Sequence, residues 1–451
     1  MGHGFSEHFE HIKKLARKEQ LYAFLFDLPK GGDLHNHLDG SNLPEWWFKV
    51  ATDKTLNRGK DCYTRTINMN CEDSNQPFIY YHNIREFTYN RLSTCCKSEY
   101  QPIGSLTEEQ KRSWLSSLKL DTDDKGCDEF FEVIFPRTRD LRHELEIMTE
   151  LLVKNMKQFG AEGVRYLETI TSPFRFQDAN GNAIDPETVA RRFRQRLSQP
   201  DALATGVIVR FQILIMRFAP DAEQQIEEAY AFITQNRDLW VSVNLVGRED
   251  NKKGHPLRFL ETFRKMRRTY SGIELSIHAG EAEEPNDYVR NTLLLGANRI
   301  GHGINLINDP DTMLLMRNNQ YLVEINLISN RLLKYVPNLT FHPFPEYLRI
   351  GIPVCLNTDD RGMWDSTMTD EYYTAVTLFN LSWDEIVQLG KNSLRYSFVE
   401  SEVKAQLLTD YKADIAKFEQ RYSTENWCKA LDEVQPISSG YAKKNFDISF
   451  S

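Results

Sequence analysis

Hydrophobic and polar positions follow two different periods along most of this chain. Short runs rich in Val, Ile and Leu alternate with longer segments in which apolar residues recur every three or four positions. The strand-like runs span residues 33–38, 164–170, 207–216, 239–246, 273–278, 299–306, 322–327 and 352–356. Near-continuous apolar strands separated by helices are typical of a parallel sheet that is covered on both faces. Eight such units favour an α/β fold of the (β/α)8 (TIM) barrel type over an open doubly wound sheet.

Three regions depart from this alternation. Residues 1–28 have apolar positions at helical spacing, with one break, and predict an N-terminal helix that either caps the barrel floor or forms a dimer contact. Residues 47–126 are polar, turn-rich and too long for an ordinary connection. We interpret them as an insertion subdomain after the first strand, with short strands and a helix near residues 108–118. Residues 367–451 predict additional C-terminal helices, and we expect one catalytic barrel domain over residues 1–451.

The composition narrows the class of protein. The chain has 451 residues, of which 41% are hydrophobic and 26% are charged, as in globular proteins with a large core. Its formal net charge of −9 argues against nucleic-acid binding and favours small substrates. No apolar run approaches the roughly 20 residues of a membrane span. The N-terminus lacks the apolar region of a signal peptide, which predicts a cytoplasmic protein unless a signal for secretion or periplasmic export has been removed.

The seven cysteines include no CxxC pair, so a structural zinc knuckle is not expected. Five of them fall between residues 60 and 130. We expect free thiols. The alternative is a disulfide such as Cys62–Cys71, which would require an oxidising compartment.

Histidines and acidic residues end several of the predicted strands. His35 and His37 are two positions apart in a strand, so their side chains project from the same face. His278 ends another strand, and Asp359 ends the last one. Three imidazoles and one carboxylate suit a single Zn²⁺ ion with a position left for water. Because a barrel places its first and last strands side by side, we expect His35, His37 and Asp359 to converge.

Three further residues are candidates for the chemistry beside this metal. Glu281 lies just past the strand that ends in His278 and is a candidate acid. His302 is flanked by two glycines and is a candidate base next to metal-bound water. Asp360 points opposite to Asp359 and would face the substrate. Each also has a structural interpretation, as a surface carboxylate, an ordinary strand histidine or a solvated loop charge.

Four motifs together resemble the adenosine deaminase family of metal-dependent amidohydrolases. They are LHNHLDG at 34–40, HAGE at 278–281, RIGHG at 299–303 and LNTDD at 356–360, in the family order. The segment 47–126 and the leading helix are similar to the growth-factor-type branch, which is secreted in animals. In that branch the N-terminal helices contribute to a dimer, so the resemblance implies a homodimer and raises the expectation of export.

The resemblance implies zinc-dependent hydrolytic deamination of adenosine or 2′-deoxyadenosine to inosine or 2′-deoxyinosine, with attack of zinc-bound hydroxide on C6 and loss of ammonia. It implies one zinc ion per chain, held by His35, His37, His278 and Asp359. It implies catalytic roles for Glu281 as proton donor to N1, His302 as the residue that orients or deprotonates the water, and Asp360 as hydrogen-bond partner of N7. It implies substrate contacts from the Gly247 backbone to N3, from Asp39 to the ribose 5′-hydroxyl and from Glu168 to the ribose.

Two departures from the family pattern leave the substrate open. Arg361 stands where members often have proline, which would favour a phosphorylated or otherwise altered nucleoside, and Asn326-Leu327 replaces a Cys-Pro-like step. Asp39, in contrast, favours a free 5′-hydroxyl because a carboxylate repels phosphate. The alternatives are a deaminase of another aminopurine nucleoside or of an N6-modified adenine nucleotide, and a growth-factor-like protein that binds a partner through residues 47–126 and has secondary activity. The insertion is also compatible with a lid or a structural elaboration.

Overall fold

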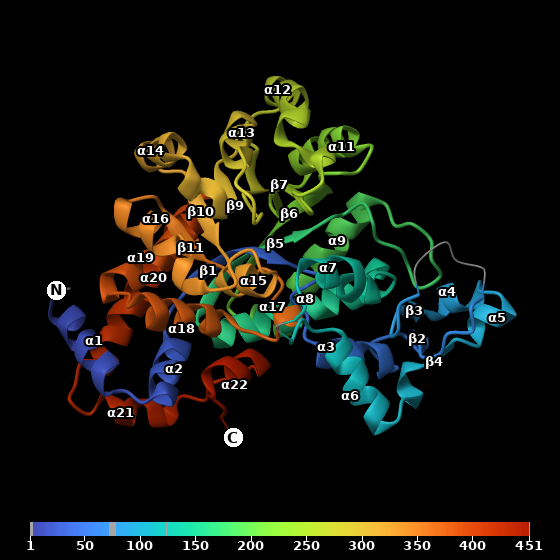
Figure 1. Cartoon of the computed structure of the whole chain (residues 1–451), viewed down its shortest axis with the longest axis horizontal. Coiled ribbons are helices and arrows are strands. Elements are labelled where there is room, and N and C mark those ends of the chain that lie inside the picture. Colours follow the sequence, from blue (N-terminus) through green and yellow to red (C-terminus); the bar gives the residue numbers. More distant parts are fainter. Residues whose placement is uncertain (1–2, 72–77, 123, 451) are drawn as a thin grey trace.

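The computed structural model describes residues 3–71, 78–122 and 124–450 and contains the predicted barrel (Figure 1). Eight parallel strands are ordered β1-β5-β6-β7-β8-β9-β10-β11. They are β1 (Gly31–His37), β5 (Val164–Thr171), β6 (Ile208–Met216), β7 (Trp240–Val246), β8 (Glu274–Ala279), β9 (Arg299–His302), β10 (Leu322–Ile325) and β11 (Val354–Leu356). An isolated parallel bridge between Asn36 and Asp359 joins the last strand to the first. The TIM-barrel prediction is therefore confirmed.

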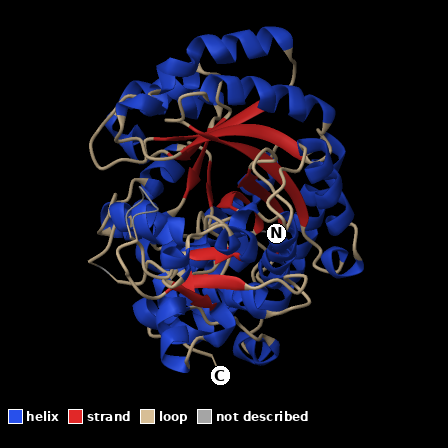
Figure 2. Cartoon of the chain, turned by 90° about the vertical axis from the view of Figure 1, so that its right-hand side faces the viewer, coloured by secondary structure: helices blue, strands red, loops and turns tan. Residues whose placement is uncertain are grey.

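Helices surround the strands (Figure 2). The Val, Ile and Leu side chains of the strands are buried. The helices along the barrel are α8 (Leu145–Ala161), α9 (Pro186–Leu197), α10 (Pro200–Leu203), α11 (Ala222–Gln235), α12 (Leu260–Thr269), α13 (Tyr288–Leu294), α14 (Pro310–Asn319), α15 (Leu327–Leu332) and α16 (Phe344–Ile350). The C-terminal helices are α17 (Arg361–Trp364), α18 (Met368–Phe379), α19 (Trp383–Arg395), α20 (Ser401–Tyr422), α21 (Trp427–Ala430) and α22 (Gly440–Phe446).

One predicted strand is shorter than its sequence pattern suggested. The run 299–306 is extended only as far as His302, and Ile304–Asn308 forms a 3-10 helix. His302 and Gly303 have φ angles of 67° and 60°, in the left-handed region that ends a strand. The apolar residues beyond Gly303 are buried in a helical turn, so apolar content alone did not distinguish the two conformations.

The N-terminal segment forms two helices, α1 (His3–Leu15) and α2 (Lys18–Asp27), with the predicted break between them. Phe5 and Phe9 are buried, and their rings lie 4.7 and 5.5 Å from that of Trp383 on α19. The apolar face of α1 therefore packs against α19, which is an outer helix of the barrel in the same chain. Whether these helices also contribute to a homodimer stays a prediction.

The segment after β1 begins with α3 (Pro44–Thr52) and continues into a three-stranded antiparallel sheet ordered β3-β2-β4. Its other elements are β2 (Cys62–Arg65), β3 (Asn83–Arg85), β4 (Tyr100–Pro102), α4 (Glu86–Asn90), α5 (Thr94–Lys97) and α6 (Glu108–Ser117), followed by α7 (Cys127–Glu129). This group lies at the end of the molecule opposite to α1 and α2 (Figure 1). Trp114 of α6 is buried and donates a hydrogen bond to Asn83 Oδ1 at 2.7 Å.

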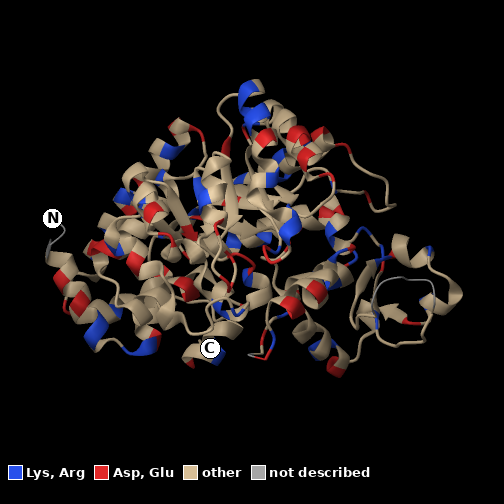
Figure 3. Ribbon diagram, turned by 45° about the horizontal axis from the view of Figure 1, so that its top comes forward, with Lys and Arg blue, Asp and Glu red and all other residues tan. Residues whose placement is uncertain are grey.

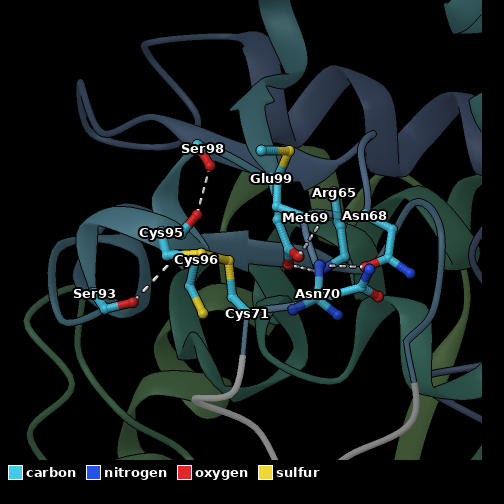
Figure 4. Close-up of a disulfide and its surroundings, with 10 residues drawn as sticks. All are labelled: Arg65, Asn68, Met69, Asn70, Cys71, Ser93, Cys95, Cys96, Ser98 and Glu99. Atoms are coloured by element: carbon cyan, nitrogen blue, oxygen red, sulfur yellow. Dashed lines mark hydrogen bonds and ion pairs between the residues drawn. A yellow bond between two sulfur atoms is a disulfide. The ribbon is translucent and has the colours of Figure 1, made fainter.

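Cys71 and Cys95 form a disulfide, which corrects the expectation of free thiols (Figure 4). The alternative pair Cys62–Cys71 is also wrong, because Cys71 is bonded to Cys95 and Cys62 forms no disulfide. The bond ties the loop after β2 to α5, next to the ion pair between Arg65 and Glu99. The other five cysteines form no disulfide.

Positions of both signs of charge are interspersed along the helices (Figure 3). Within the described part of the chain, no helix has the length and apolar content needed to cross a membrane.

The disulfide makes a prediction about thiol counts. Alkylation of the unfolded, unreduced protein should modify five cysteines, and alkylation after reduction should modify seven, because only Cys71 and Cys95 are bonded. Intact-mass spectrometry measures both numbers. Seven modifications without reduction would contradict the bond.

Candidate active site

Four side chains that could bind a metal ion meet at the C-terminal end of the barrel. His35 and His37 come from β1, His278 from β8, and Asp359 directly follows β11, as predicted. One nitrogen or oxygen atom of each lies within 4.8 Å of the others. The closest approaches join His37 Nε2 to Asp359 Oδ1 at 3.2 Å, His37 Nε2 to His278 Nε2 at 3.3 Å and His35 Nε2 to Asp359 Oδ1 at 3.4 Å.

These residues fit a zinc ion. Tetrahedral zinc with bonds of about 2.0–2.1 Å separates its ligands by roughly 3.3 Å. His35 Nε2 and Asp359 Oδ1 are buried and have no hydrogen-bond partner, so both are available to a cation. The other oxygen of Asp359 accepts a hydrogen bond from Ser329 at 2.7 Å, which orients the carboxylate.

A buried carboxylate holds His35. Glu324 Oε2 lies 2.8 Å from His35 Nδ1. Burial opposes ionisation of Glu324, but Arg299 and His35 lower its pKa to about 2, so it stays ionised. Asp359 and Glu324 raise the pKa of His35 to about 10 despite its burial, so a metal that binds Nε2 must displace a proton.

Asn244 holds His278 from its other side. Asn244 Oδ1 lies 2.8 Å from His278 Nδ1, and its amide donates to Gln212 Oε1 at 2.8 Å. Gln212 in turn donates to Glu168 Oε2 at 3.1 Å, which fixes the orientation of both amides. Burial lowers the pKa of His278, so its imidazole is neutral with Nε2 free for a metal.

Glu168 has a different place from the one that the family resemblance implied. It is fully buried inside the barrel and is absent from the cavity lining. Its carboxylate accepts hydrogen bonds from Arg299 at 2.6 Å, Tyr166 at 2.7 Å and Gln212 at 3.1 Å. Arg299 also donates to Glu324 at 2.6 Å. Two chains of hydrogen bonds therefore begin at Glu168. One reaches His35 through Arg299 and Glu324. The other reaches His278 through Gln212 and Asn244.

Glu281 faces the candidate metal-binding residues. Its Oε2 lies 3.5 Å from His302 Nε2. Burial and the nearby Asp359 and Glu249 carboxylates raise the pKa of Glu281 well above its ordinary value, which favours the protonated acid. Glu249 also accepts the backbone N–H groups of Gly280 and Glu281 at 3.0 and 3.2 Å and so holds the loop in place.

A chain of hydrogen bonds sets the tautomer of His302. The Phe344 N–H donates to His342 Nδ1, so the His342 proton lies on Nε2 and is donated to Asn330 Oδ1. The Asn330 amide therefore donates to His302 Nδ1, at 3.0 Å. Burial lowers the pKa of His302 to about 3. The neutral ring thus carries its proton on Nε2, which points toward Glu281 and Asp359.

Asp360 lies beside the cluster. Burial and Asp359 raise the pKa of Asp360 well above its ordinary value, so it is a hydrogen-bond donor. Gly40 makes room for it, because a Cβ there would lie 1.6 Å from Asp360 Oδ1.

A cavity of about 510 Å³ opens over these residues. Its apolar lining comes mainly from barrel strand ends and from the segment after α7: Phe130, Phe131, Phe135, Met216, Phe218 and Val246. Its polar lining includes the predicted residues His37, Asp39, Gly247, His278, Glu281, His302, Asp359 and Asp360. Gly247 has a φ of 99°, and a Cβ there would lie 2.6 Å from Met216 Sδ. A cavity that combines apolar rings with convergent polar groups is typical of a small-molecule site.

The two departures from the family pattern lie in different places. Arg361 is buried away from the cavity, where it donates to Asn155 at 2.8 Å and lies over the Phe159 ring, so the proposed substrate role of Arg361 is wrong. Asn326 reaches the site, because its amide lies 3.2 Å from His302 Nδ1.

Sequence reasoning missed the residues that orient the candidate site, namely Asn244, Glu249, Arg299, Glu324 and Asn330. Glu324 carried a usable signal, since it is a single charge in the apolar run 322–327. Charges almost never lie fully buried without a partner.

The family model described as adenosine deaminase matches residues 101–413, more than half of the chain. The chain belongs to the adenosine deaminase family. The model and the relatives below support the expectation of a hydrolytic deaminase.

Three relatives show the extent of the similarity. An adenine deaminase of Chelativorans sp. is 29% identical over 57% of this chain and 76% of its own length. An adenosine deaminase of Vibrio parahaemolyticus is 34% identical over 43% of this chain and 56% of its own, so this match spans little more than half of that enzyme. Adenosine deaminase 2-A of Danio rerio is 25% identical over 89% of this chain and 82% of its own.

Solved structures share the fold. An adenine deaminase from Arthrobacter aurescens has a TM-score of 0.62, with 22% identity over 86% of this chain and 99% of its own. An amidohydrolase from Burkholderia ambifaria with bound Zn has a TM-score of 0.65, with 15% identity over 90% and 96%. The Arabidopsis ADAL protein complexed with IMP has a TM-score of 0.64, with 20% identity over 87% and 99%.

The contact between Glu324 and His35 in this member of the adenosine deaminase family leads to a prediction about metal affinity. The Glu324→Gln variant should bind zinc about 10- to 100-fold more weakly, the usual effect of losing a carboxylate behind a metal-bound histidine. Competition with a chromophoric chelator measures the affinity. Glu346→Gln, at an exposed position on α16, is the matched control. Unchanged zinc affinity in Glu324→Gln would contradict the role of Glu324 in orienting His35. Thermal unfolding of the metal-free variants distinguishes a loss of zinc affinity from a loss of the fold.

Proposed function

We propose that this protein is a zinc-dependent hydrolase that removes the 6-amino group of adenosine or 2′-deoxyadenosine, giving inosine or 2′-deoxyinosine and ammonia. The observation that carries the proposal is a buried glutamate of raised pKa, Glu281, which faces a three-histidine, one-aspartate cluster beneath an apolar cavity. The family membership supports this class of reaction.

His35, His37, His278 and Asp359 would hold one zinc ion per chain. When bound, zinc lowers the pKa of a water molecule to about 7 and so supplies a nucleophile at neutral pH. Glu324 and Asn244 accept hydrogen bonds from the Nδ1 atoms of His35 and His278, which holds these two imidazoles in the orientation that this requires.

Protonated Glu281 would donate its proton to N1 of the purine. Protonation of N1 draws electrons from the ring and makes C6 more electrophilic. Asp360, which is also protonated, would donate a hydrogen bond to N7. The Gly247 backbone would meet N3, where the absence of a side chain leaves space beside Met216 and Phe218.

His302 would orient the attacking water by donating its Nε2 proton to the water oxygen. The hydrogen bond from Asn330 to Nδ1 supports this role over that of a base, because Nε2 already carries the proton. Overall, one water molecule is consumed and one ammonia molecule leaves for each purine.

We also infer folding in an oxidising compartment, because the Cys71–Cys95 bond forms and persists there. The disulfide supports export over the cytoplasmic location expected from the N-terminal sequence. Isolation from a reducing cytoplasm with this bond intact would contradict the inference.

The role of Glu281 makes a prediction about turnover. Glu281→Gln keeps the shape of the side chain but removes the acidic proton, so kcat should fall by about 10²- to 10⁴-fold, the usual contribution of a general acid. Ammonia release from adenosine by the zinc-loaded protein measures it. Glu283→Gln, which is exposed in the same loop, should keep normal turnover. Full activity of Glu281→Gln would exclude its role as the acid.

The raised pKa of Glu281 makes a prediction about pH. Because the active form is the protonated acid, kcat/KM should be retained through the ordinary glutamate range near 4.5 and should fall only as pH rises through the raised pKa. A pH profile of adenosine turnover measures this limb. If kcat/KM already fell as the pH rose through the ordinary glutamate pKa, the assignment of Glu281 as the acid would be contradicted.

A further inference from the structure

Three polar side chains of one short segment contact the candidate active site from outside the cavity. Asn326 directly precedes α15, and Ser329 and Asn330 lie within it. Ser329 donates a hydrogen bond to Asp359 Oδ2 at 2.7 Å. The amides of Asn326 and Asn330 lie 3.2 and 3.0 Å from His302 Nδ1. The placement of α15 therefore sets the orientation of two groups that the proposed reaction uses.

A buried glutamate from a different helix holds the start of α15. Glu371, in the first turn of α18, is fully buried and is absent from the cavity lining. Its Oε2 accepts the Leu327 N–H at 3.0 Å, and its Oε1 accepts the Ile328 N–H at 3.1 Å. The first backbone N–H groups of a helix have no partner within that helix, so these two bonds fix where α15 begins.

The start of α18 is itself bonded to three other parts of the chain. Asp370 accepts hydrogen bonds from Tyr22 on α2 at 2.7 Å and from Ser439, just before α22, at 2.6 Å. The N–H and the hydroxyl of Thr369 donate to Glu162, at the end of α8, at 2.9 and 2.8 Å. The carboxylate that holds α15 thus belongs to a turn that is fixed independently of α15.

We propose that Glu371 is a positioning residue for the reaction. It acts through α15, because its two hydrogen bonds hold Asn330 against His302 and Ser329 against Asp359. The inference rests on the proposed deaminase function and extends that site to a side chain outside the four active-site motifs. Loss of one of the two bonds lets the start of α15 move, which weakens the hydrogen bond to His302 Nδ1.

The first test is turnover of adenosine by the zinc-saturated full chain. Glu371→Gln keeps the size of the side chain but replaces one acceptor oxygen by an amide group that cannot accept a backbone N–H. We expect kcat to fall by about tenfold, the range of one lost hydrogen bond to a charged group. KM should change by less than about twofold, because Glu371 does not line the cavity. Glu402→Gln, at an exposed position in the first turn of α20, is the matched control. A normal kcat in Glu371→Gln would overturn the proposal.

A double-mutant cycle distinguishes action through α15 from a general loss of stability. Asn330→Ala removes the amide that Glu371 is proposed to position. In that background Glu371→Gln should lower kcat by less than about threefold, because residues that act on one group are not additive. Fully additive losses would contradict the proposal. Glu371→Asp, which withdraws the carboxylate by one methylene, should reproduce the loss of kcat. Unfolding of both Glu371 variants would also contradict the proposal, because Glu371 would then be required for the fold as a whole.

Nuclear magnetic resonance of the imidazole nitrogens gives a readout that does not depend on turnover. The Nδ1 signal of His302, assigned with His302→Gln, should shift in Glu371→Gln because the hydrogen bond from Asn330 is weaker. The signals of His82, in the insertion after β1, should stay where they are. An unchanged His302 signal would overturn the positioning role. A shifted signal in a protein that releases no ammonia would support the positioning role and refute the deaminase proposal.

Discussion

The contact between β1 and β11 is the constraint on which the candidate site depends. The Asp359 N–H donates to the His35 carbonyl at 2.9 Å, and the His37 N–H donates to the Asp359 carbonyl at 3.0 Å. The residues that close the barrel are therefore the same residues that offer metal ligands. A metal bound by these side chains would link the first and last strands a second time. Metal binding and barrel closure should stabilise each other, because any ligand that binds only the folded chain raises its stability.

The interior of the barrel below this contact is unusually polar for a buried core. Glu168, Arg299 and Glu324 are fully buried, and Arg299 forms an ion pair with each of the two glutamates. Buried ion pairs often stabilise a fold less than apolar side chains of similar volume would. Here they have a clear geometric effect, since they orient His35 directly and His278 through Gln212 and Asn244. The stability that an apolar core would add is given up for a defined orientation of the imidazoles.

The cavity combines two electrostatic environments. At the end with the candidate metal ligands, burial and neighbouring carboxylates raise the pKa of Glu281 and Asp360, so each side chain can donate a hydrogen bond. At the other end, Asp39 is ionised because two arginines surround it. Apolar rings also line the cavity, and a surrounding of low dielectric constant strengthens electrostatic interactions.

Much of the fold and the metal ligands were predictable from the sequence by itself. The eight strands and the convergence of His35, His37 and Asp359 follow from local apolar patterns and from the rule that a barrel joins its first and last strands. Only the tertiary structure decided that Glu168 lies inside the barrel, that Arg361 is buried away from the cavity and that Cys71 pairs with Cys95. The His302 tautomer also depends on Asn330 and His342 together. The physical reason is that strand periodicity is encoded by neighbouring residues. Hydrogen bonds, ion pairs and disulfides instead join side chains far apart in the sequence, and their partners are set by how the elements pack.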